Sequence, residues 1–172
     1  MTSPHPGLGL HVVASGATDL VLTRTFAAPA PLVFAALTQP ELLRRWHGAR
    51  GWRLTVCEVD LRPGGAWRFV STGPAGAEME LHGLFREVVP PVRLVQTEIH
   101  RDWADGEALV TTVLDETDGH TTMTVTARYS SPEIRDMVVR SSMQRGAGEG
   151  YDRLAAVLTT LPPQLPNERH QP

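Results

Sequence analysis

The sequence contains no lysine. All sixteen of its basic residues are arginines, and they stand against nineteen acidic residues, which gives a formal net charge of -3. Without lysine, the chain cannot work through a lysine Schiff base. The slight excess of acidic residues argues against a general nucleic-acid binder, because such proteins carry a basic surface.

Cysteine is nearly absent as well. Cys57 is the single one, so neither an internal disulfide nor a thiolate metal cluster can form, and we interpret it as a small buried apolar residue. The seven histidines are scattered without metal-ligand spacing. The sequence also lacks a Gly-x-Ser-x-Gly elbow, a His-Glu-x-x-His pair, a phosphate loop and a dinucleotide fingerprint. We therefore expect no metal and no cofactor.

No hydrophobic run approaches the roughly 20 residues of a membrane span, and the first residues show no charged n-region. We expect a soluble cytoplasmic protein. With 172 residues, 41% of them hydrophobic, the chain suits one domain. Its composition predicts a flexible Gly- and Pro-rich arm over residues 1–18, the domain over 19–161 and a disordered tail over 162–172.

Most of the domain alternates with period two, which is typical of strands. The segments that we expect to be strands are residues 19–26, 53–60, 66–72, 78–88, 92–99, 108–115 and 121–129. Val12 and Val13 could add a weak edge strand. Gly- and Pro-containing turns separate the segments, and Asp118-Gly119 predicts a tight hairpin.

Helical spacing appears in four places. Residues 31–37 and 41–46 predict two short helices, the second capped by Thr38. Ser131-Pro132 opens a third helix. Residues 141–161 form the longest amphipathic stretch, in which one stripe carries Met143, Ala147, Tyr151, Leu154, Ala155 and Leu158.

The order of these elements predicts an α+β fold. About seven antiparallel strands would curve around the long C-terminal helix, with two short helices between the first and second strands. Gly146, Gly148 and Gly150 would let backbone or a ligand approach that helix. A curved sheet that grips one helix leaves a space between them, and we expect an internal cavity there.

Several motifs resemble the Bet v 1-like (START-like, SRPBCC) superfamily, in the branch named after the activator of Hsp90 ATPase homologue 1. They are Phe26-Ala27-Ala28-Pro29, Val33-Phe34-Ala35-Ala36-Leu37-Thr38, Pro40-Glu41-Leu42 with Trp46, Asp60-Leu61-Arg62-Pro63-Gly64-Gly65-Ala66-Trp67-Arg68-Phe69, Gly83 with Phe85 and Glu87, Pro90 with Arg93 and Leu94, and Gly150-Tyr151 with Asp152, Arg153 and Leu154. The resemblance covers residues 19–160 and implies a helix-grip fold with a cavity for hydrophobic small molecules.

The chain departs from the pattern of that branch at four places. His47 stands where a second aromatic is common, Gly48-Ala49 replaces Gly-Pro, Asp118-Gly119-His120-Thr121 replaces a Gly-Gly-Thr turn, and Tyr151 replaces a tryptophan. These positions would lie at the lining or the mouth of the cavity. The identity of the ligand therefore cannot be carried over from the resemblance.

The candidate ligand-binding residues are aromatic and apolar side chains on the expected inner faces. They are Trp46, Trp67, Phe69, Met79, Leu81, Phe85, Val110, Met137, Met143 and Tyr151. Cavity lining is the interpretation that concerns function. Ordinary core packing is the alternative for each of them, and Trp67 and Phe69 are balanced between the two.

Three residues are weak catalytic candidates. Glu98 would be a buried carboxyl group with a raised pKa if its strand face points inward, and a solvated charge if it points outward. His47 could act as a general base at the mouth of the cavity, although we favour a solvated loop position. Tyr151 could donate a proton. We expect His100 to point away from Glu98, and His82 to lie on the outer face.

Three functions follow from these patterns. Non-enzymatic binding of an apolar or aromatic small molecule, such as a lipid or a polyketide-like compound, is our first hypothesis. A cyclase- or hydrolase-type enzyme that uses a pocket Glu or His is the second. A partner module for an Hsp90-type chaperone, implied by the family resemblance alone, is the third. We expect a monomer or a homodimer.

Overall fold

The computed structural model describes residues 9–102 and 106–163. Its strands are β1 (His11–Ser15), β2 (Asp19–Phe26), β3 (Arg53–Val59), β4 (Ala66–Thr72), β5 (Glu78–Val89), β6 (Arg93–His100), β7 (Ala108–Thr117) and β8 (His120–Arg128). Its helices are α1 (Ala30–Thr38), α2 (Pro40–Trp46), α3 (Pro132–Arg140) and α4 (Met143–Leu158), with a short 3-10 turn η1 (Pro74–Gly76).

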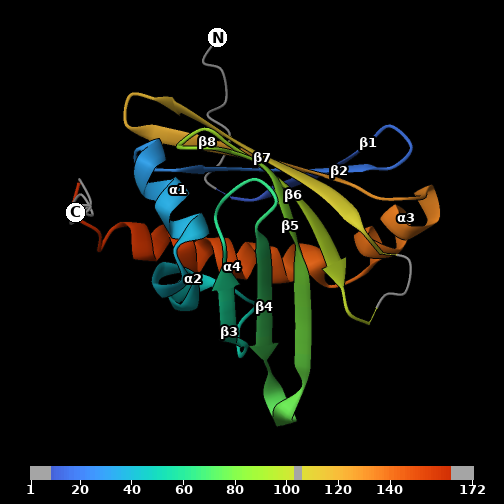
Figure 1. The fold of residues 1–172 in the computed structure, drawn as a ribbon. Coiled ribbons are helices and arrows are strands. Elements are labelled where there is room, and N and C mark those ends of the chain that lie inside the picture. The colour runs from blue at the N-terminus through green and yellow to red at the C-terminus, as the bar shows by residue number, and fades with distance from the viewer. Residues whose placement is uncertain (1–8, 103–105, 164–172) are drawn as a thin grey trace.

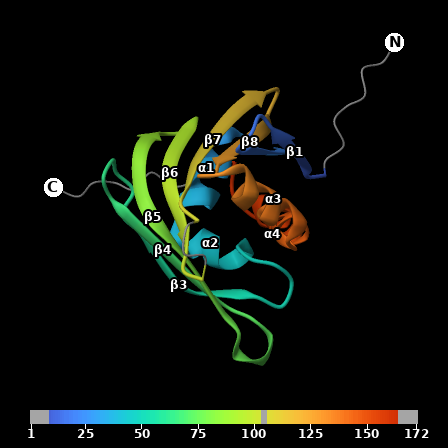
Figure 2. The same cartoon turned by 90° about the vertical axis from the view of Figure 1, so that its right-hand side faces the viewer.

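All eight strands form one antiparallel sheet in the order β1-β2-β8-β7-β6-β5-β4-β3. The sheet curves strongly, and the helices lie on its concave side, with α4 running across it (Figures 1 and 2). The helix-grip α+β fold expected from the sequence is therefore confirmed, with eight strands instead of about seven.

The additional strand is β1. Residues 11–15 fall within the N-terminal arm of the sequence analysis, which allowed only a weak edge strand at Val12 and Val13. All five pair with β2, in a register that joins Val13 to Val21. Residues 1–8 of the arm and 164–172 of the tail lie outside the described residues.

Local turn and cap chemistry explains most of the boundaries. Asp118 and Gly119 both have positive φ, at 52° and 76°, as a two-residue hairpin turn requires, and this prediction is confirmed. Ser131 caps α3 by accepting a hydrogen bond from the amide of Ile134 at 3.2 Å, also as predicted.

The predicted cap of α2 is wrong. Thr38 lies in the last turn of α1, where its hydroxyl donates to the carbonyl of Phe34 at 2.8 Å. A threonine hydroxyl that bonds back by four residues is unavailable as an N-cap. Gln39 holds the cap position of α2 instead, without a side-chain hydrogen bond to the helix.

Helix α4 turns the predicted apolar stripe toward the sheet. In its second half Leu154 and Leu158 are buried, and they belong to the main core together with α1, α2 and the inner faces of β2, β7 and β8. In its first half the inward residues are small or only partly buried, such as Gly146 and Ala147. One end of the space under α4 is therefore filled, and the other end is not.

Candidate functional site

A cavity of about 440 Å³ lies under the first half of α4. Its walls come from α4, the inner faces of β4, β5 and β6, the start of β7, the segment after β8, and the loop after α2. Trp46, Trp52, Met79, Leu81, Ala108, Val138, Met143, Ala147 and Tyr151 supply most of its apolar surface, and Glu98, His47, His100, Ser71 and Tyr129 supply most of its polar groups. The volume falls within the range of small-molecule sites.

The loop of residues 47–52 forms one wall and is fastened to α4. A Cβ at Gly150 would lie 3.3 Å from the carbonyl oxygen of Gly48, so the two backbones are nearly in contact. Arg153 donates to the carbonyls of Trp46 and Gly48, at 3.2 and 3.3 Å. The sequence suggested that the glycines of α4 let either backbone or a ligand come close. At Gly150 it is the backbone of the 47–52 loop that comes close, and this contact holds the loop in place as a wall of the cavity.

Glu98 points into the cavity from the inner face of β6. It pairs in register with Ala108 of β7, whose small side chain leaves space in front of the carboxyl group. Burial removes water from the charged form and raises the pKa of Glu98 to about 7. Among the described residues it makes no hydrogen bond or ion pair.

Both tyrosines of the chain face the same space as Glu98. Tyr129 directly follows β8, and Tyr151 projects from α4 with its ring centroid 5.9 Å from that of Trp46. Burial, with the charge of Glu98 as the second cause, raises the pKa of each phenol to about 12. Both hydroxyl groups therefore stay protonated and can donate or accept hydrogen bonds.

His47 is partly buried with its ring packed among aromatic side chains, so our preference for a solvated loop position is wrong. Its ring packs against Phe69 at 5.1 Å and Trp46 at 5.4 Å between centroids. Burial, helped by the charge of Arg153, lowers its pKa to about 4, so the imidazole is neutral at pH 7. Its Nδ1 atom is buried with no hydrogen-bond partner among the described residues.

His100 shares the inner face of β6 with Glu98 and lines the cavity. The expectation that the two would point to opposite faces was wrong, because residues two apart in a strand share a face. Burial lowers the pKa of His100. The cavity therefore brings a carboxyl group, two phenols and two imidazoles together.

The structure separates the ten predicted ligand-binding residues into two groups. Trp46, Met79, Leu81, Met143 and Tyr151 line the cavity. Trp67, Phe69, Phe85, Val110 and Met137 are absent from its lining. Met137 is 43% exposed on α3, because the buried side of that short helix is carried by Val138.

Trp67 belongs to the packed core instead of the cavity lining, and its hydrogen bond explains why. Its indole Nε1 donates to the carbonyl of Thr97 at 3.1 Å, directly over Gly83. A Cβ at Gly83 would lie 1.8 Å from that carbonyl oxygen, so only glycine admits this packing. Phe69 makes edge-to-face contacts with Trp67 and with His47, and only His47 of these three lines the cavity.

Sequence reasoning missed Tyr129 and Ala108 as lining residues. A signal existed for Tyr129, which extends the inward stripe of β8. Trp52 also lines the cavity, and its ring packs on Gly73, where a Cβ would lie 2.5 Å from the indole. Ala108 gave no signal, because a small residue shows its use only once its neighbours across the sheet are known.

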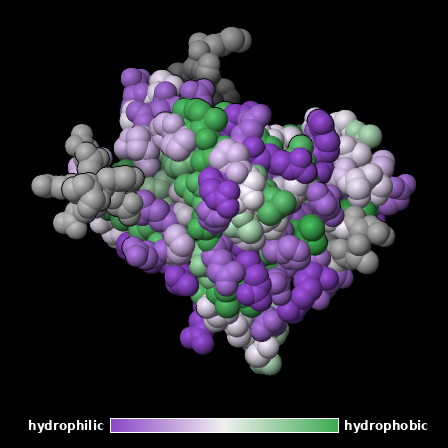
Figure 3. Space-filling model, viewed as in Figure 1, coloured by the Kyte–Doolittle hydropathy of each residue, from purple (hydrophilic) through white to green (hydrophobic). Residues whose placement is uncertain are grey.

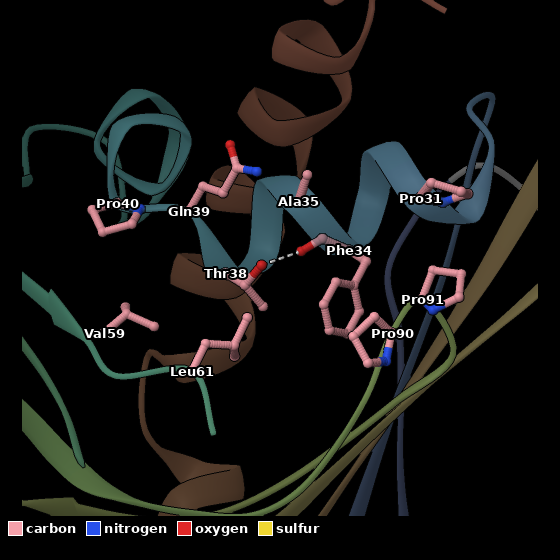
Figure 4. Close-up of a pocket in the computed structure, with 10 residues that line it drawn as sticks. All are labelled: Pro31, Phe34, Ala35, Thr38, Gln39, Pro40, Val59, Leu61, Pro90 and Pro91. Carbon is pink, nitrogen blue, oxygen red and sulfur yellow. Dashed lines mark hydrogen bonds between the residues drawn. The ribbon is translucent and has the colours of Figure 1, made fainter. Parts of the chain in front are cut away.

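A second hollow, of about 610 Å³, lies outside the sheet-helix space. Phe34 from α1, Leu61 after β3 and Pro90 after β5 converge on it (Figure 4). The same face of the molecule shows a central hydrophobic band bordered by hydrophilic residues (Figure 3). This hollow is the larger of the two, but none of the described residues that line it has an ionisable side chain, so the candidate chemistry lies in the cavity under α4.

The family described as activator of Hsp90 ATPase homolog 1-like protein matches residues 27–159. The chain belongs to this family. The match spans the elements from α1 to α4, so it includes the complete cavity.

Solved structures agree with the family assignment. A Rhodobacter sphaeroides protein is 37% identical with a TM-score of 0.84, over 89% of this chain and 99% of its own. A Nitrosomonas europaea protein is 31% identical with a TM-score of 0.77, over 86% and 97%. A Silicibacter pomeroyi member of the family is 24% identical with a TM-score of 0.69, over 83% and 98%, and shows the fold alone. No curated protein matches.

Within residues 9–102 and 106–163, no helix has the length and hydrophobicity that a membrane span requires. No group of three or more His, Cys, Asp or Glu residues in the described ranges could hold a metal ion. The family and the fold support a ligand-binding or chaperone-activator module.

Proposed function

We propose that the chain binds an apolar or aromatic small molecule in the cavity under α4. The observation that carries the proposal is this 440 Å³ space, which is lined mainly by apolar side chains and holds a few convergent polar groups. Trp46, Met79 and Met143 offer surface to a flat or chain-like body. Glu98, Tyr129 and Tyr151 can orient its polar end.

The test uses two matched variants of α4. Ala147 lines the cavity, whereas Ala156 is exposed on the opposite side of the same helix. A panel of fatty acids, flavonoids and polyketides is screened against the wild type by thermal shift and by quenching of tryptophan fluorescence. We expect a stabilising compound whose affinity falls at least tenfold in Ala147→Leu and is unchanged in Ala156→Leu.

Two results would contradict the proposal. One is a complete panel without a single binder. The other is a binder that tolerates Ala147→Leu, because the added side chain occupies the cavity and only a ligand bound elsewhere would be indifferent to it. The variant itself is expected to fold, since leucine is a good helix former and enters an unfilled space.

A cyclase- or hydrolase-type enzyme is the second candidate. It is favoured by the carboxyl group of Glu98, whose pKa of about 7 suits proton transfer near neutral pH, and by the neighbouring phenol of Tyr151. Each compound that binds is incubated with the protein and analysed by mass spectrometry. Conversion that is lost in Glu98→Gln would support this candidate, whereas full recovery of every bound compound would contradict it.

The remaining expectations stay predictions. A partner module for an Hsp90-type chaperone is tested by a pull-down with the Hsp90 homologue of the host, and an empty pull-down would close it. A cytoplasmic monomer or homodimer is tested by cell fractionation and by light scattering.

A further inference from the structure

Among the described residues that line the cavity, Glu98 is the single carboxyl group, and there is no arginine to balance its charge. Several arginines on the adjoining elements are engaged elsewhere: the buried Arg24 with Asp152, Arg101 with Glu78 and Glu80, Arg128 with Asp19, and Arg153 with backbone carbonyls. Glu98 is partly buried, and a carboxylate withdrawn from water without a counter-charge is unfavourable unless a partner arrives with the ligand.

The ionisable groups that face Glu98 do not supply that charge. Tyr129 and Tyr151 are neutral phenols, and the negative charge of Glu98 contributes to their raised pKa values. His47 stays neutral because burial holds its pKa near 4. Burial also lowers the pKa of His100. Each of these groups therefore presents polar atoms to the cavity without a positive charge at neutral pH.

Aromatic rings surround the same space. Trp46, Trp52, Tyr129 and Tyr151 all line it, from three different parts of the chain and from α4. The face of an aromatic ring attracts a cation, most strongly when the site excludes water. A carboxylate beside several rings is therefore complementary to an ammonium group carried on an apolar body.

We propose that the ligand of this cavity is an amine: an apolar or aromatic body whose protonated nitrogen lies against the carboxylate of Glu98. The ammonium group has three N–H donors. The carboxylate and the hydroxyl oxygens of Tyr129 and Tyr151 can accept them, while the apolar body lies along Leu81, Met79 and Met143. This inference rests on the proposed function, because it names the chemical class that the same cavity takes.

The experiment compares two probes of equal shape, 4-phenylbutylamine and 4-phenylbutan-1-ol. An alkylamine resembles the lysine side chain, whose pKa is about 10.4, so it is protonated at pH 8. Titration calorimetry at pH 8 is expected to give an affinity at least tenfold higher for the amine than for the alcohol. In Glu98→Gln this preference should disappear, with the affinity for the alcohol unchanged.

Two controls accompany the titration. Glu107→Gln removes an exposed charge beside the cavity and should leave the preference intact, which separates direct contact from long-range attraction. In the wild type, the affinity for the amine should fall as the pH is lowered through about 7, where Glu98 gains its proton, while that for the alcohol stays level. This second measurement does not depend on how well any variant folds.

The outcomes separate the amine from the cavity itself. If both probes bind equally, or the alcohol binds better, the amine inference is overturned, and the cavity still binds apolar molecules. If neither probe binds, the amine inference is overturned as well. The function proposed above then fails only if the wider panel also yields no binder.

Discussion

Among single residues, Glu98 has the clearest consequence for stability. Its pKa in the folded state is about 7 instead of the usual 4.5, so the folded state holds the proton more tightly than the unfolded state does. The stability that this contributes is fully present below pH 4.5 and is lost as the pH rises through about 7. Glu98→Gln should therefore be more stable than the wild type at pH 8, by roughly 2–3 kcal/mol.

Urea denaturation from pH 5 to pH 8.5 measures this difference. The two proteins should differ least at pH 5 and should diverge toward pH 8. The effect of His47 on stability has the opposite dependence on pH. Because its pKa is lowered to about 4 in the folded state, the stability that it contributes is lost as the pH falls from about 6.5 toward 4. Because both proteins keep His47, its effect cancels in the comparison. A constant difference across the range would show that Glu98 is solvated.

For strand β5, the sequence predicted correctly which residues face the interior. It did not predict which of these line the cavity and which are packed in the core. Leu81 and Phe85 share one face of β5, yet Leu81 lines the cavity and Phe85 lies in the core. Period two fixes the face of a strand but carries no information about position along it. That position depends on where α1, α2 and the second half of α4 pack, which is a tertiary property.

The same limit applies to Glu98, where the sequence left both faces open. Its orientation follows from the register with Ala108 on β7, and cross-strand register cannot be obtained from one strand. The misjudged position of His47 has a related cause. A histidine beside a glycine is usually solvated, but here Arg153 of α4 draws the loop against the sheet.

At the scale of the elements, substitutions of the glycines in α4 can show what each glycine contributes. Glycine is about 1 kcal/mol less favourable than alanine inside a helix. A Cβ at Gly148 would meet only Leu10, at 4.0 Å, whereas a Cβ at Gly150 would lie 3.3 Å from the carbonyl oxygen of Gly48. Gly148→Ala should therefore raise the free energy of unfolding by about 1 kcal/mol.

Gly150→Ala is the matched substitution on the same helix. The alanine has the same advantage in helix propensity, but its Cβ crowds the backbone of the 47–52 loop. The net change in the free energy of unfolding should therefore be near zero or destabilising. Chemical denaturation of both variants gives the comparison. Equal stabilisation by the two substitutions would mean that the loop does not press on α4, and the wall of the cavity would then be less fixed than its contacts indicate.

Element boundaries were the most predictable part of the fold, because the signals are local. Asp19–Phe26 and Ala66–Thr72 coincide with the expected strands, since alternation and adjacent turn residues define both ends. Thr38 failed as a cap because two local interactions compete for one hydroxyl, and the bond to Phe34 forms within its own helix. The edge strand β1 was underestimated because its residues are mostly exposed and gain stability from pairing with β2 rather than from burial.

At the scale of the whole molecule, one part of the interior is a packed core and the other contains the cavity, so local stability should differ between the two parts. Leu114 and Met123 lie where the sheet is covered by a packed core, and Ser71 and Met79 lie beside the cavity. Amides open more readily where fewer apolar side chains are buried. Hydrogen exchange measured by mass spectrometry should therefore be faster in β4 and β5 around Ser71 and Met79 than in β7 and β8 around Leu114 and Met123.

A bound ligand should change this gradient in one direction. Binding to the folded state alone stabilises it according to ligand concentration and affinity, and the added contacts fall on the walls of the cavity. Exchange should slow most in β4, β5 and the first half of α4. Uniform exchange without ligand would contradict an interior that is packed under one end of α4 and hollow under the other. Protection confined to the packed end in the presence of ligand would contradict binding in the cavity.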